Sequence, residues 1–269
     1  MVRKFTYPLL IALLIVGSGC SKFRKIQKSD DWKVKYEAAL DYYEEKDYYR
    51  SNTLLEEIIP IIRGTQEAEK ANFIYPYTYF EQGQYILSSH YFKTFTEVYA
   101  RSEYAEEAAY MYAYSMYKQS PQPSLDQTST YEAIAALQNF LNKYPASTYA
   151  DKADNLIDEL QVKLETKAYE NARLYYKLRR YKAALIAIDN FQLDFPDSKY
   201  NEELIFMGIE TAFELAQVSI RSKQEERFKN TIVRYQKFID RYPNSKYIKQ
   251  GEKYFADSSE QLTIFADQN

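Results

Sequence analysis

The sequence has little of the residues that make turns, disulfides or common catalytic centres. Its 269 residues include one cysteine, one histidine, one tryptophan, six glycines and eight prolines. A sandwich or barrel of many short strands needs turn residues at the strand ends, so this composition excludes those folds. A lone cysteine can form neither an internal disulfide nor a multi-thiolate metal site.

The charge balance excludes a further class of proteins. The chain carries 35 Lys and Arg against 38 Asp and Glu, a formal net charge of -3. No basic block stands outside its first residues, so there is no field to steer nucleic acid, and we exclude nucleic acid as a partner. Hydrophobic residues make up 46% and charged residues 27%, which is typical of a folded globular chain.

Catalytic motifs are missing as well. The only histidine, His90, falls in the middle of a predicted helix, where packing or solvent contact is its expected role. The glycines after residue 20 are isolated, so the chain has no Gly-rich phosphate loop. With neither a nucleophile–base pair nor a metal cluster, we predict a protein that is not an enzyme and binds no metal or dissociable cofactor.

The first twenty residues have the order of a secretory signal. Arg3 and Lys4 precede the apolar run 9–16, and the small residues 17–19 follow it. That run is far shorter than the ~20 residues of a membrane-spanning helix. We therefore predict a lipoprotein signal peptide over residues 1–19, ahead of Cys20.

Cys20 has two interpretations, a buried apolar residue near a chain end or an acylation site. Residues 16–20, Val-Gly-Ser-Gly-Cys, resemble a bacterial lipobox. The resemblance implies a thioether-linked diacylglycerol and an N-acyl chain on Cys20. Several acyl chains, at ~0.8 kcal/mol per buried CH₂, hold a protein at a membrane without spanning it.

Residues 20–33 are predicted to form a short lipidated tether. The segment 21–28 lacks Gly and Pro and is basic, which suits contact with anionic headgroups. No acidic cluster follows Cys20, and Ser21 stands where inner-membrane lipoproteins of enterobacteria carry Asp. By resemblance to other lipoproteins, both features favour the outer membrane, with the protein facing the periplasm.

Beyond residue 33 the chain repeats itself. Four segments, which begin at Phe95, Phe140, Phe191 and Phe238, share the pattern F-x3-[YF]-[PA]-x-S-x-Y. The Pro has no N–H to donate and drives the residue before it out of the α region, so a helix ends there. The Ser two positions later is expected to cap the first turn of the next helix.

The residues before each Phe form a buried stripe. A small residue stands seven positions earlier and a large one three positions earlier, so both share a helix face with the Phe. A weaker fifth copy runs from Ser51 to Ile58. These helical hairpins resemble tetratricopeptide repeats, and the resemblance implies an all-α fold: a right-handed superhelical solenoid of about five hairpins with a C-terminal capping helix.

The predicted array of hairpins has two functional parts. Residues 34–145 hold repeats 1–3 and a predicted peptide-binding groove, and residues 146–243 hold repeats 4–5 and a predicted partner-binding surface. Residues 244–269 are the capping helix and tail. The stretch 119–129 is predicted to be a Pro-containing loop, and 148–178, which has no Gly or Pro, one long helix.

Tyrosines are crowded in the first two repeats. The candidates for a peptide-binding wall are Tyr36, Tyr42, Tyr43, Tyr75, Tyr77 and Tyr79. Tyr suits packed cores as well as interfaces, so plain helix packing is the alternative interpretation.

Three features together resemble the BamD family, the lipoproteins of the outer-membrane barrel-assembly machine. They are the lipobox, the hairpin repeats directly after a short tether, and the recurring [YF]-P-x-S-x-Y corner. The segment 35–43 is of the type that opens this family's first repeat. Residues 45–47 depart from it, because the family usually has Gly or Asn there. The resemblance implies a scaffold that binds the barrel-inserting outer-membrane subunit, other assembly lipoproteins and unfolded barrel precursors.

The last repeat concentrates basic residues. The candidate partner contacts are Arg221, Arg227 and Arg234, with three lysines among them. Such a patch can orient an acidic partner. The BamD resemblance places the basic residue nine before the corner Pro, here Arg234, against the barrel subunit, while a solvated helix face is the alternative.

Two other functions stay open at this stage. One is a tetratricopeptide lipoprotein scaffold for a different cell-envelope process. The other is a small glycan-binding lipoprotein, which ranks lower because such proteins carry clustered Trp and this chain has only Trp32.

Overall fold

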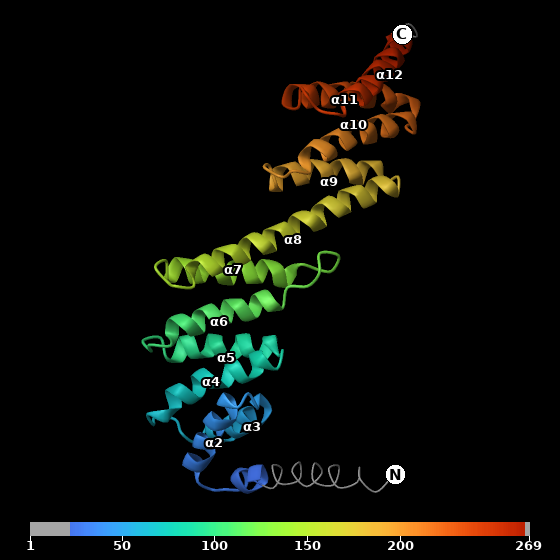
Figure 1. Cartoon of the computed structure of the whole chain (residues 1–269). Coiled ribbons are helices and arrows are strands. Elements are labelled where there is room, and N and C mark those ends of the chain that lie inside the picture. The colour runs from blue at the N-terminus through green and yellow to red at the C-terminus, as the bar shows by residue number, and fades with distance from the viewer. Residues whose placement is uncertain (1–21, 267–269) are drawn as a thin grey trace, which may run out of the picture. The chain divides into compact units, whose positions relative to one another are not determined.

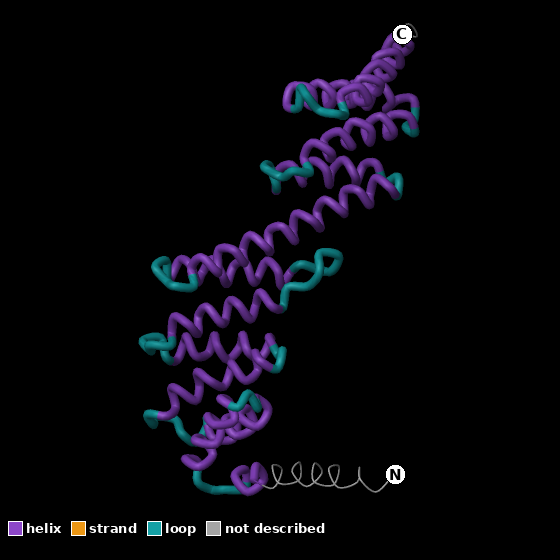
Figure 2. The backbone as a smooth tube through the Cα atoms, in the orientation of Figure 1, coloured by secondary structure: helices purple, strands orange, loops and turns teal. Residues whose placement is uncertain are grey.

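The computed structural model describes residues 22–266, and within that range all regular secondary structure is helical (Figure 1, Figure 2). Residues 22–27 form a short helical stretch. The helices that follow are α2 (Trp32–Glu44), α3 (Tyr48–Ile58), α4 (Glu67–Glu81), α5 (Tyr85–Val98), α6 (Ala105–Lys118), α7 (Thr128–Lys143), α8 (Ala150–Lys177), α9 (Tyr181–Asp194), α10 (Asn201–Gln217), α11 (Arg221–Arg241) and α12 (Ile248–Ala266). The all-α prediction is confirmed.

The helices form two compact units, which meet in sequence inside α8. The first unit ends at Leu160, and the second begins at Gln161 and also takes in the loop residues Gln122–Leu125. The sequence-based division at 145/146 lies in the turn before α8 instead. The predicted long helix over 148–178 is confirmed by the 28 residues of α8.

In the first unit each helix from α2 to α7 packs against the next one along the chain. The predicted stripe is buried in all three hairpins of this unit. Its members are Ser51, Leu55 and Ile58 on α3, Ser88, Phe92 and Phe95 on α5, and Ala133, Leu137 and Phe140 on α7. The small residue of each stripe lets the facing helix approach closely, as the pattern predicts.

The second unit repeats this arrangement with α9, α10, α11 and α12. Its buried stripe residues are Ala184, Ile188 and Phe191 on α9, and Thr231, Tyr235 and Phe238 on α11. The final helix, α12, packs on both α10 and α11, and its Phe265 is buried beside Phe213 and Phe228. It therefore covers the last hairpin, as a terminal cap must.

The hydroxyl of each corner serine accepts a hydrogen bond from a residue just before the next helix, and not from the first turn of that helix as the sequence predicts. Ser102, Ser147, Ser198 and Ser245 accept the N–H of the residue two positions on, at 2.9 to 3.1 Å. That residue is the Tyr just before the helix, and the helix begins one residue later. The expected cap on the first helical turn is therefore wrong, because the Ser hydroxyl closes the turn that leads into the helix.

Within the hairpins, the turns use residues in the left-handed region. Gly83 between α4 and α5 has φ +74°, a conformation natural for glycine. Lys46 between α2 and α3 has φ 62°, and Arg179 between α8 and α9 has φ 53°. The departure from Gly or Asn in segment 45–47 thus leaves a lysine in a conformation that side chains disfavour.

Candidate functional site

The tyrosines proposed for a peptide-binding wall lie on α2 and α4, and half of them are buried. Tyr42, Tyr75 and Tyr79 have exposed fractions of 8%, 5% and 8%. The hydroxyls of Tyr75 and Tyr79 lie 2.8 Å apart in a hydrogen bond, and both rings pack on Tyr91 of α5. This corrects the assignment of these three residues to an open wall, because Tyr75 and Tyr79 pack between the two helices of their hairpin and Tyr42 packs against Phe23.

The other three members, Tyr36, Tyr43 and Tyr77, are partly exposed. The Tyr77 hydroxyl donates to the carboxylate of Glu107 on α6, and its ring lies edge-on to Tyr43 at 6.4 Å between centroids. Burial, helped by that hydrogen bond, raises the pKa of Tyr77 well above its ordinary value. Burial likewise raises the pKa of Tyr43 to about 12. These three rings are therefore accessible to a ligand only in part.

Tyrosine–glutamate hydrogen bonds connect the first helices of neighbouring hairpins. The pairs are Tyr77–Glu107 and Tyr117–Glu159 in the first unit, and Tyr169–Glu203 and Tyr254–Glu210 in the second. The tyrosine donates each time. The hydrogen bond to Glu159, together with burial, raises the pKa of Tyr117 to about 12. Burial, helped by the contact with the glutamate, raises the pKa values of Tyr169 and Tyr254 to about 12. Sequence analysis missed these pairs because their members are 30 to 44 residues apart.

The three arginines predicted as partner contacts are each engaged inside the second unit. The contacts are Arg221 over the ring of Phe265 at 3.6 Å, Arg227 donating to Ser219, and Arg234 paired with Asp189. On the same helix the lysines at 223 and 229 pair with glutamates at 226 and 225. Each of the three arginines is therefore engaged within the second unit, Arg234 in an ion pair, and their role as partner contacts stays a prediction.

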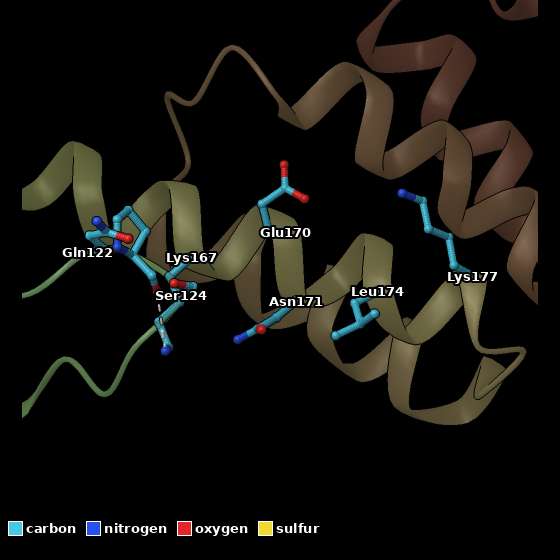
Figure 3. A pocket seen from close by; sticks show the side chains of 8 residues that line it. Gln122, Ser124, Lys167, Glu170, Asn171, Leu174 and Lys177 are labelled. Atoms are coloured by element: carbon cyan, nitrogen blue, oxygen red, sulfur yellow. Dashed lines mark hydrogen bonds between the residues drawn. The ribbon is translucent and has the colours of Figure 1, made fainter.

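A groove in the second unit is the site that sequence analysis did not find. It has a volume of about 530 Å³ and lies between the loop after α6 and the C-terminal half of α8 (Figure 3). Its lining residues are Gln122, Pro123, Ser124, Lys167, Glu170, Asn171, Leu174 and Lys177. The sequence marked the loop and the long helix separately, and no repeated pattern indicates that they meet.

Lys167 positions the loop that forms one wall of the groove. Its ammonium donates to the carbonyl oxygens of Pro123, at 3.4 Å, and of Leu125. Pro123 fixes its own φ, and the two carbonyl contacts join this short segment to α8. Lys167, on the α8 side of the groove, therefore holds in place the loop that lines the other side.

The chemistry of the lining suits binding. Leu174, half exposed at 50%, gives an apolar contact between Asn171 before it and Lys177 after it on α8 (Figure 3). Amide and charged groups on the rim can pair with main-chain or acidic groups of an extended chain. The groove combines apolar surface, to which Leu174 and Pro123 contribute, with amide and charged groups beside it.

The predicted lipidation site, Cys20, lies outside the described residues. Among residues 22–266, no helix has both the length and the apolar character that crossing a bilayer requires.

A comparison with protein families shows to which family the chain belongs. A family profile described as "YfiO: Outer membrane lipoprotein" matches residues 28–203 and 163–264. The chain belongs to the YfiO family of outer membrane lipoproteins. Residues 163–203 fall in both YfiO matches, as expected when a profile meets an internal repeat. YfiO is the BamD family, so the resemblance inferred from the sequence is confirmed. A search of curated proteins gave no significant match.

Proposed function

We propose that this YfiO-family protein is a non-enzymatic, lipid-anchored scaffold of the outer-membrane β-barrel assembly machinery. The family match, which extends along residues 28–264, is the observation that carries the proposal. The lipobox-like segment before Cys20 supports acyl anchoring, and the tether after it supports a body that faces the periplasm.

The proposed partners are the barrel-inserting outer-membrane subunit, other lipoproteins of the machine and unfolded barrel precursors. Stacked hairpins offer extended surfaces that take up both folded domains and extended chains. Because Tyr42, Tyr75 and Tyr79 are buried, the groove beside Leu174 replaces the tyrosine wall as our candidate for holding extended precursor segments.

Depletion of the protein tests the assembly function. We expect the whole set of outer-membrane barrels to fall together, while periplasmic and inner-membrane proteins persist. Quantitative proteomics of isolated outer membranes measures this, with a strain complemented by the wild-type gene as the control. Loss confined to one transport system, with barrels in general intact, would instead favour the scaffold of another envelope process.

Photo-crosslinking tests the groove. A crosslinking residue at position 174 should capture barrel precursors during their synthesis. The matched control is position 193 on α9, where Leu193 is 79% exposed but lies outside the groove. Equal capture from both positions would rule out the groove as the specific contact and would leave the depletion result unaffected.

A further inference from the structure

The segment that follows the predicted anchor is docked on the first repeat. The ring of Phe23 lies edge-on to Tyr42 of α2 at 5.8 Å, and the Arg50 guanidinium of α3 lies 5.6 Å from the Phe23 ring. Ile26 packs against the same core, and the Gln27 amide donates to the Glu57 carboxylate at 3.0 Å. Residues 22–27 therefore form part of the first unit, where the sequence suggested a simple tether.

The docked residues all lie on one side of this helical stretch. At 3.6 residues per turn, Phe23, Ile26 and Gln27 fall within roughly one third of the circumference. The basic residues fill the rest, and all four are exposed: Lys22, Arg24, Lys25 and Lys28. The amide of Lys28 donates to the carbonyl of Arg24 at 3.2 Å, so the helical path continues through the last of them.

One of these four basic residues, Lys22, lies near acidic side chains. Lys22 shares a hollow with the acidic residues Glu37 and Asp41 of α2 and with Glu45, which follows that helix. Within the described residues, Arg24, Lys25 and Lys28 have no carboxylate in an ion pair. These three cations, named here the basic face, point away from the first repeat because the opposite side of the helix is docked.

We propose that the basic face binds anionic phospholipid headgroups and holds the first repeat against the membrane surface. Charge complementarity identifies the occupant, since clustered Lys and Arg next to a membrane bind anionic lipids. In sequence the face begins four residues after Cys20, so an acyl anchor there would keep it at the headgroups. Because Phe23 fixes this helical stretch to the first repeat, attraction between the basic face and the headgroups also orients the first repeat relative to the membrane.

Vesicle binding tests this without any acyl chain or assembly partner, so its outcome is independent of the proposed assembly function. The probe is the chain from residue 20 onward with Cys20→Ser, mixed with phosphatidylcholine vesicles with or without phosphatidylglycerol. We expect binding only when the anionic lipid is present, with affinity falling as salt is added. Reversing all three charges, with Arg24→Glu, Lys25→Glu and Lys28→Glu, should weaken binding by at least roughly a hundredfold, since loss of each cation alone costs about fivefold.

A matched variant separates the position of the charges from their number. Lys237→Glu, Lys249→Glu and Lys253→Glu change the same charge at exposed sites on α11 and α12. This control should bind as the parent does, and both variants should unfold thermally as the parent does. Equal loss of binding in both variants, or binding to phosphatidylcholine alone, would overturn the proposal, as would a basic-face variant that binds fully while folded.

The single tryptophan reports which end of the chain meets the membrane. Trp32 opens α2, close in sequence to the basic face, so its emission should transfer to a dansyl group on the lipid headgroup. Transfer should disappear in the basic-face variant and persist in the α11/α12 control. Vesicle binding without transfer from Trp32 would mean that another surface, not this face, contacts the lipid.

Discussion

Arg234 of α11 and Asp189 of α9 form a two-pronged ion pair between the second helices of successive hairpins. Nη1 lies 2.8 Å from Oδ1, and Nη2 lies 2.7 Å from Oδ2. Nη1 is also 3.4 Å from the position that a Cβ on Gly208 would occupy. The small residue on α10 therefore leaves room for a guanidinium that joins α9 to α11 in the second unit.

This pair predicts a coupling in stability. Arg234→Ala and Asp189→Ala should each lower the free energy of unfolding by about 1 kcal/mol, since the geometry is bidentate but Asp189 is half exposed and screened. Denaturant unfolding of both variants and of the double variant measures the coupling, with Lys237→Ala as the surface control. Strictly additive effects would show that the pair contributes nothing.

The strained turn of the first hairpin predicts a stabilising substitution. Lys46 has φ 62°, so Lys46→Gly should raise the free energy of unfolding by up to about 1 kcal/mol. Glu45→Gly next to it should lower stability, because Glu45 has φ -72° and gains nothing from glycine. Thermal unfolding of the two variants decides it, and a loss of stability in Lys46→Gly would contradict the assignment of strain.

The raised tyrosine pKa values predict destabilisation in alkali. Tyr43, Tyr117, Tyr169 and Tyr254 have folded-state pKa values raised to about 12 from the ordinary 10.0. Below pH 10 both states keep these protons, so stability is full; between pH 10 and about 12 the unfolded state loses them first, and stability falls. Tyrosinate absorbance and helical circular dichroism, followed together as pH rises, measure this.

In that titration the tyrosinate absorbance should rise at a higher pH than ordinary tyrosines give, and together with the loss of helix. Tyr117→Phe should reduce the late absorbance by one tyrosine, because its hydroxyl is held by Glu159. If every tyrosine of the protein ionises at its ordinary pKa while the helices persist, the hydrogen-bonded pairs do not hold in solution.

Lys167 predicts protection of the loop between α6 and α7. Lys167→Ala removes the donor to the carbonyls of Pro123 and Leu125. Loss of about 1 kcal/mol from this contact should raise the rate of limited proteolysis in residues 119–127 roughly fivefold. Lys177→Ala, at the other end of the groove, is the control. Unchanged cleavage in Lys167→Ala would show that the loop is held by other contacts.

Lipid attachment is predicted to depend on a single side chain. Cys20→Ser should abolish incorporation of a labelled fatty acid, because the hydroxyl does not replace the thiol in thioether formation. The variant should also be released from membranes or stay unprocessed. A variant in which Ser21 is replaced by Ala serves as the control and should label normally. Label that survives Cys20→Ser would refute the anchor.

The sequence by itself determined the helices and their repeat. Helix ends follow from a Pro that has no N–H, and the buried stripe follows from residues three and seven positions apart, so both are local effects. The 28-residue α8 and the capping role of α12 were predictable for the same reason. The role of the corner Ser was not, because two residues separate it from the helix that it was expected to cap.

Tertiary structure alone decided which side chains are free to bind. Asp189 and Arg234 are 45 residues apart, and Tyr77 and Glu107 are 30 apart, so they meet only through the stacking of hairpins. That stacking buried Tyr75, placed Arg234 of α11 on the carboxylate of α9 and brought Lys167 to the loop. Helix periodicity specifies which face is apolar; which polar groups then pair is set by the register between helices, and no local pattern encodes that register.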